Sequence, residues 1–228
     1  SVRTGIKIPA HIRSFMETLT PEEQCMKNDP RNFEVASKYI LKFNKPTLEI
    51  QTTGGQPMYD ITRNAIEYAV RTNLNSMTPK HRKFVKTHWN GVLFISIKKL
   101  VRTAGRGSYQ IPWHRDSHEM QYDGIKHKGF CVGAIYVNKP DLPGGNIQFA
   151  RNTRRYGFAP PSGTSVTFFD DEIFHRVIPV QAPEGLEHVP RSAFFMAYGT
   201  DEKGPFKIGI REENIGNRNY EKFYRTLD

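Results

Sequence analysis

The residues best suited to chemistry form a His-x-Asp motif, His114-Arg115-Asp116, which follows an alternating segment that begins at Tyr109. Alternate side chains of an extended segment point to the same face, so we expect His114 and Asp116 to project together and Arg115 to point away. Two His and one carboxylate on one face make a facial metal site with open positions, a donor set that suits Fe(II). His175, fifty-nine residues after Asp116, is the best candidate for the third ligand. The sequence therefore predicts a metal site formed by His114, Asp116 and His175.

A candidate carboxylate-binding residue follows this site along the chain. Arg191 and Ser192 open an apolar strand sixteen residues after His175. A guanidinium in that position is able to bind a carboxylate through two parallel hydrogen bonds. Taken alone, His114 or His175 fits a buried core histidine better, and Asp116 fits a turn. The ordered set of His-x-Asp, His and Arg on predicted strands favours the metal site.

Other ionisable residues near the motif have simpler explanations. His118 and His127 lie in a polar stretch, where we expect solvated side chains. Arg151, Arg154 and Arg155 follow the turn at residues 144–145. They suit a substrate carboxylate and a solvated hairpin about equally.

The first ninety residues must support the site, and their pattern is mainly helical. Apolar stripes at helical spacing predict helices over residues 8–27, residues 29–41, from residue 60 to about residue 74, and residues 79–89. The second of these begins at Asp29-Pro30 and carries Phe33, Ala36, Ile40 and Leu41.

From Val92 the period changes to that of strands. Strands are predicted over residues 92–97, 109–114, 130–138, 146–150, 164–170, 174–180 and 191–198. A run of short strands at close spacing indicates a sandwich, barrel or jelly roll. Because the helices need the sheet to cover their apolar stripes, we predict one domain of the α+β class: residues 1–90 mainly helical, 91–200 the jelly-roll core, and 201–228 a C-terminal extension.

Composition narrows the class of protein and its partners. The chain has 228 residues, 37% hydrophobic and 25% charged, an ordinary globular mix, with only two cysteines, Cys25 and Cys131. Few cysteines argue against a disulfide framework, so we predict a reducing, cytoplasmic location. No apolar run approaches a membrane span, so no membrane partner is expected.

Residues 1–110 hold 18 Lys and Arg against 8 Asp and Glu, a net charge of +10, while residues 111–228 hold 15 of each. This excess fits an anionic partner such as nucleic acid, but spread-out solvated basic faces explain it more simply.

The strand half of the sequence resembles the Fe(II)/2-oxoglutarate-dependent oxygenases. The segments 114–116, 144–146 and 169–180 are similar to the branch of bacterial isoleucine dioxygenase, over about residues 90–200. The resemblance implies a double-stranded β-helix (a jelly roll), Fe(II) held by His114, Asp116 and His175, 2-oxoglutarate as cosubstrate, and O2. It implies that Arg191 binds the distal carboxylate of 2-oxoglutarate, with help from Ser192 or Thr167.

The function implied is a dioxygenase that oxidises a C–H bond, most simply by hydroxylation, of a free amino acid or a small molecule derived from one. Desaturation and ring closure are alternative outcomes. The same chemistry on a peptidyl residue or a nucleic-acid base is the second hypothesis, although no aromatic residues alternate with the basic ones to stack bases. A binding module without iron and a zinc hydrolase rank lower; a hydrolase has no need of Arg191. The polar stretch 117–129 is longer than the branch leads us to expect and suits a lid over a larger substrate.

Overall fold

The computed structural model describes residues 1–19, 32–102, 111–114, 116, 118–138, 145–151, 154–169, 174–177, 191–201 and 204. Three helices lie within these ranges: α1 (Ala10–Thr18), α2 (Asp60–Ser76) and α3 (Pro79–His88). Most of the strands follow the helices, and they are β1 (Val2–Arg3), β2 (Asn32–Asn44), β3 (Glu49–Thr52), β4 (Val92–Arg102), β5 (Ile111–His114), β6 (Glu119–Tyr122), β7 (Ile125–Asn138), β8 (Ile147–Arg151), β9 (Arg154–Phe158), β10 (Thr164–Phe168), β11 (Phe174–Val177) and β12 (Arg191–Thr200). The predicted C-terminal extension falls almost wholly outside the described residues. None of the described helices is long and apolar enough to cross a membrane.

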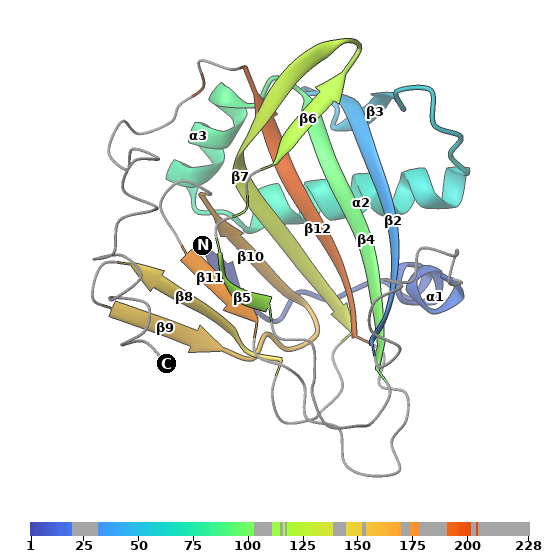
Figure 1. Ribbon diagram of the computed structural model, residues 1–228. Helices are drawn as coiled ribbons and strands as arrows, with labels where there is room; N and C mark the ends of the chain where they lie inside the picture. The colour runs from blue at the N-terminus through green and yellow to red at the C-terminus, as the bar shows by residue number, and fades with distance from the viewer. Residues whose placement is uncertain are drawn as a thin grey trace.

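Two antiparallel sheets face each other in the strand half (Figure 1). The large sheet has the order β1-β10-β7-β12-β4-β2-β3, with β6 paired to β7, and the small sheet has the order β5-β11-β8-β9. Along the chain, β4, the β6–β7 pair, β10 and β12 belong to the large sheet, and β5, the β8–β9 pair and β11, which come between them in turn, belong to the small sheet. This strand order is consistent with a jelly-roll fold.

The helices cover the face of the large sheet that points away from the small sheet (Figure 1). Apolar side chains of α1 and α2, such as Phe15, Ile66 and Leu74, pack against Ile95 and Phe194 of the sheet. A second apolar cluster fills the space between the two sheets, where Val132, Tyr136 and Phe168 of the large sheet meet Phe149 and Phe158 of the small one. The sheet thus separates a helix-facing core from an inner core.

Helices α2 and α3 follow local signals in the sequence. The predicted stripe of α2 is fully buried at Ile66, Ala69, Val70 and Leu74. Helix α3 begins with Pro79, and the Thr78 hydroxyl accepts a hydrogen bond from the backbone N–H of His81. Both helices confirm the sequence-based prediction.

The helix predicted over residues 29–41 was wrong, because residues 32–44 form β2. Its backbone pairs with β4 in an unbroken antiparallel register from Asn32↔Arg102 to Lys42↔Val92. Tyr39, Leu41 and Phe43 alternate toward the helix-facing core, a period of two that the stripe of Phe33, Ala36 and Ile40 obscured. Pairing with a distant strand therefore overrode the local pattern.

Candidate metal centre

His114, Asp116 and His175 come together between the two sheets. His114 ends β5 and His175 is the second residue of β11, and the two are direct partners in the antiparallel register. The Nε2 atom of His114 lies 3.2 Å from Oδ1 of Asp116, and Nε2 of His175 lies 3.3 Å from Oδ2. All three ligand atoms lie within 4.8 Å of one another. Strand pairing thus gathers two imidazoles around one carboxylate.

This geometry fits a divalent metal ion. Two neighbouring ligands of an octahedron with metal–ligand bonds of about 2.1 Å are separated by about 3.0 Å. The two His–Asp distances, each to a different oxygen of the carboxylate, exceed that separation by only a few tenths of an ångström. The side chains of His114 and Asp116 are 32% and 23% exposed, whereas that of His175 is 6% exposed. The centre is therefore open on the side of His114 and Asp116, where further ligands would enter.

Aromatic packing fixes the ring of His175. Its centroid is 4.6 Å from that of Phe168 on β10 and 6.3 Å from that of Phe149 on β8. Its Nδ1 atom is buried and has no hydrogen-bond partner among the described residues. A hydrogen bond to the second nitrogen commonly orients a metal-bound His, and here the two Phe rings take over that orienting task. The sequence pattern did not single out either Phe as a partner of His175, although both lie in predicted strands.

The electrostatics of the centre favour an ionised carboxylate. Burial by itself raises the pKa of Asp116, but hydrogen bonds with His114 and His175, and the charges of His175 and His118, together lower it well below its usual range. Asp116 is therefore charged at neutral pH, the form in which a carboxylate binds a metal ion.

The opposite face of the small sheet carries a separate group of contacts. The Arg176 guanidinium lies over the Trp113 ring at 4.8 Å, and its Nε donates to Oε1 of Gln148 at 2.7 Å. Trp113 precedes His114 by one position, and Arg176 follows His175 by one position. Alternation along the strands therefore places both side chains on the outer face of the small sheet. Arg176 is thereby occupied away from the candidate centre.

The predicted cosubstrate residues differ in their positions. Arg191 is the first residue of β12, where its backbone pairs with Leu100 of β4; its side chain lies outside the described residues. Thr167 is 3% exposed, and its hydroxyl accepts a hydrogen bond from Nδ2 of Asn73 on α2 at 3.1 Å. Thr167 therefore faces the helices, across the large sheet from the triad, and this position does not support a cosubstrate role. Alternation puts Ser192 on the same helix-facing side as Phe194.

The polar stretch 117–129 proves to be mostly a β-hairpin rather than a loop. Strands β6 and β7 join through Asp123 and Gly124, which have φ values of 51° and 72°, as a two-residue type I′ turn requires. His127 is 7% exposed and its Nδ1 lies 2.8 Å from Nδ2 of Asn90, so the prediction of a solvated His127 was wrong. His118 is half-buried, with its ring 5.3 Å from that of Phe94.

Comparisons with known proteins bear on the fold. No family model matches the chain, and no curated protein sequence matches it. Two solved structures align over most of its length with a TM-score of 0.51. One is a prolyl-4-hydroxylase from Pseudomonas putida, at 12% identity over 87% of this chain and 90% of that one. The other is the 2-oxoglutarate complex of the viral collagen prolyl hydroxylase vCPH from Paramecium bursaria Chlorella virus-1, at 11% identity over 88% and 94%. The chain shares the fold of these two prolyl hydroxylases.

The comparisons do not resolve a branch within that fold. The structure of IDO from Bacillus thuringiensis aligns at 15% identity over 84% of this chain and 85% of that one, with a TM-score of 0.45. A TM-score below 0.5 does not establish a shared fold, so the similarity to the isoleucine dioxygenase branch stays a prediction. Sequence identities of 11% and 12% with the two prolyl hydroxylases support a shared fold alone.

Proposed function

We propose that the protein is a non-haem Fe(II)- and 2-oxoglutarate-dependent dioxygenase that hydroxylates an aliphatic C–H bond of an amino-acid unit. The observation that carries the proposal is the convergence of two His Nε2 atoms on the Asp116 carboxylate, at 3.2 and 3.3 Å, inside a fold shared with a 2-oxoglutarate complex. We infer that β4, β5 and β7–β12 form the double-stranded β-helix of such enzymes. A zinc hydrolase could use the same three ligands, but the shared fold and the Arg at position 191 favour the oxygenase.

His114, Asp116 and His175 would hold Fe(II) through two nitrogens and one oxygen, with positions left for 2-oxoglutarate and O2. Bound together, these groups would supply the oxidation: 2-oxoglutarate is converted to succinate and CO2 as one oxygen atom is inserted into a C–H bond.

The chain's own contribution is binding, orientation and exclusion of water. Arg191 is our candidate for the distal carboxylate of 2-oxoglutarate, because a guanidinium pairs with a carboxylate through two hydrogen bonds. It belongs to the same alternate set of strand positions as Ala193, which packs in the cluster between the sheets. Phe168 and Phe149 would hold His175 in place and keep water from its buried side.

Two forms of the substrate are open to test. The free aliphatic amino acid is the substrate that the isoleucine dioxygenase resemblance implies. A residue within a polypeptide is the second candidate, and it is supported by the names of the two structures with TM-scores of 0.51, both of which are prolyl hydroxylases.

Succinate formation tests the proposal. The purified protein would be incubated in air with Fe(II), 2-oxoglutarate and either a panel of free amino acids or a panel of peptides, and products would be identified by mass spectrometry. We expect succinate and a product heavier by one oxygen atom. Absence of 2-oxoglutarate turnover by iron-loaded protein, with and without candidate substrates, would reject the proposed function.

A further inference from the structure

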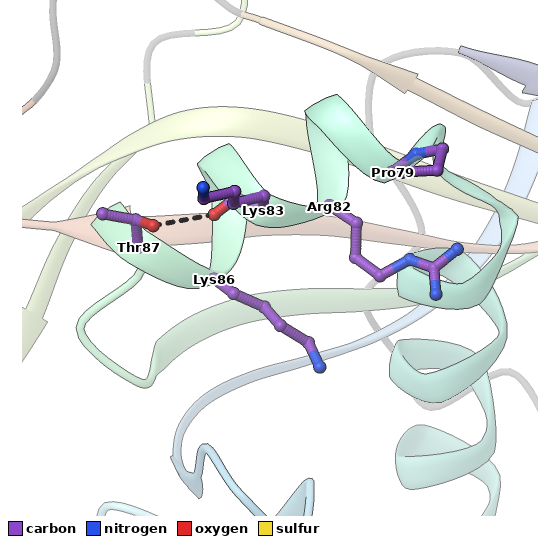
Figure 2. A pocket seen from close by; sticks show the side chains of 5 residues that line it. All are labelled: Pro79, Arg82, Lys83, Lys86 and Thr87. Carbon is purple, nitrogen blue, oxygen red and sulfur yellow. Dashed lines mark hydrogen bonds between the residues drawn. The ribbon is translucent and has the colours of Figure 1, made fainter.

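An open groove of about 430 Å³ runs along the outer surface of α3. It is lined by Pro79, Arg82, Lys83, Lys86 and Thr87, and Figure 2 shows the side chains of Arg82 and Lys86 extending in the same direction from the helix. Lys83 and Lys86 are exposed. The groove therefore presents several cations and no carboxylate.

The surrounding sequence leaves these cations without acidic neighbours along the chain. No Asp or Glu occurs from Tyr68 to Arg115, a stretch that holds ten Lys and Arg. Within the described part of the chain, no ion pair involves Arg82, Lys83 or Lys86. Surface cations are usually interspersed with acidic residues, so this local field is unusually one-sided. It attracts anions to one particular helix.

Arg82 gives the groove a fixed charge. Its Nη2 atom donates to the carbonyl oxygens of Asn75 at 3.3 Å and Met77 at 3.2 Å, which ties the guanidinium to the α2–α3 connection. The hydroxyl of Thr87 donates to the carbonyl oxygen of Lys83 at 2.8 Å (Figure 2). A charge held in place loses less conformational entropy on binding than a free side chain.

Helix α3 and the candidate metal centre lie on opposite sides of the large sheet, at the end of β10. Phe84 of α3 packs against Phe169 with ring centroids 5.2 Å apart. The adjacent Phe168 points to the other face of the sheet, where its ring is 4.6 Å from that of His175. The thickness of α3 and of the sheet alone separates the groove from the triad by about 15–20 Å, and a ligand that reaches both must pass round the edge of the sheet. A free amino acid is too short to do so, whereas an extended polypeptide, at about 3.3–3.6 Å per residue, reaches both with more than about six residues.

We propose that the groove on α3 docks an acidic segment of a polypeptide substrate while a residue more than about six positions away in the same polypeptide enters the candidate metal centre. This inference rests on the proposed function and names the substrate class. The surface does not suit nucleic acid, because the aromatic residue of α3, Phe84, packs inward and leaves no stacking platform. It does not suit membrane insertion either, because its exposed residues other than Pro79 are charged or polar.

A defined probe tests the docking surface: a fluorescein-labelled peptide of eight glutamates, with binding followed by anisotropy at low salt and on salt titration. The test variant is Lys83→Glu/Lys86→Glu. The matched control, Lys7→Glu/Lys45→Glu, changes net charge equally at positions away from α3. We expect the wild type and the control to bind alike and the test variant to bind about tenfold more weakly. Circular dichroism and melting temperature verify that both variants fold.

Three outcomes overturn the proposal: no binding by the wild type, equal weakening by the test and control variants, or a loss of single-stranded DNA or anionic vesicle binding as large as the loss of peptide binding. Substrate-free turnover of 2-oxoglutarate is measured in parallel and should be the same in all three proteins. If turnover of 2-oxoglutarate is absent from the wild type both with and without candidate substrates, the proposed function fails, and the peptide binding result still decides whether the groove binds acidic polypeptide.

Discussion

Asn73 on α2 joins the helix layer to the large sheet through a buried network. Its Nδ2 lies within hydrogen-bonding distance of the hydroxyls of Ser165 and Thr167 at 3.0 and 3.1 Å. Its Oδ1 accepts a hydrogen bond from the Tyr198 hydroxyl at 2.8 Å. Asn73 and Tyr198 are both fully buried, so water is not available to replace these partners. We predict that Asn73→Ala strongly destabilises the fold.

The expected magnitude follows from the groups left behind. A buried polar group that loses its partner costs about 1–3 kcal/mol. The Tyr198 hydroxyl would keep only the sulfur of Met196 at 3.5 Å, a weak acceptor, and the Ser165 and Thr167 hydroxyls would lose a donor. We therefore expect a loss of about 3 kcal/mol in the free energy of unfolding. In a protein of this size that loss lowers the melting temperature by about 6–12 °C.

Thermal and urea denaturation measure this loss, with Asn64→Ala as the matched control. Asn64 is exposed on the same helix, so its replacement should change the free energy by less than about 0.5 kcal/mol. A double-mutant cycle with Tyr198→Phe should give a coupling of about 1 kcal/mol. If Asn73→Ala melts within about 2 °C of Asn64→Ala, well short of the expected shift, the reasoning about the network is refuted.

Three further predictions concern packing, pH and the cosubstrate. Gly133→Ala should destabilise the protein because its Cβ would collide with Oδ1 of Asn73, and Asn73→Ala in the same chain should relieve part of that loss in urea denaturation. Burial, followed by the charge of Lys42, lowers the pKa of His127 below its usual 6.5. The unfolded chain therefore takes up a proton first as pH falls below about 6.5, so stability decreases, and His127→Gln should flatten this decrease between pH 7.5 and 5.5. Arg191→Lys should raise the KM for 2-oxoglutarate and Arg191→Ala should raise it further with iron retained; an unchanged KM in Arg191→Ala would contradict its role.

Local sequence signals predicted the elements whose start and buried face are encoded by neighbouring residues. The apolar stripe of α2 and the Thr78-Pro79 start of α3 are recognised from residues that lie within one or two helical turns of one another. Strand β2 was missed because its register is set by β4, about sixty residues away along the chain. The β6–β7 hairpin was also missed, since the polar residues on both sides of its Asp-Gly turn resemble a solvated loop.

The site was predictable only in part, for a related reason. Alternation along an extended segment placed His114 and Asp116 on one face, and the structure brings their side chains within 3.2 Å. Alternation does not say which face is the inner one. Every residue of β10 is buried, so the hydrophobic pattern could not reveal that Thr167 faces α2. The partners Phe149 and Phe168 of His175 come from strands that meet only in the fold.

Anaerobic titration with Fe(II) tests the central claim most directly, because it measures the metal centre without assuming a substrate. Calorimetry on the metal-free protein should give one Fe(II) per chain for the wild type and for His11→Ala, an exposed His outside the centre. Asp116→Ala and His175→Ala should lose this binding while keeping the far-ultraviolet circular dichroism of the folded protein. Wild-type iron binding by either variant would contradict the account.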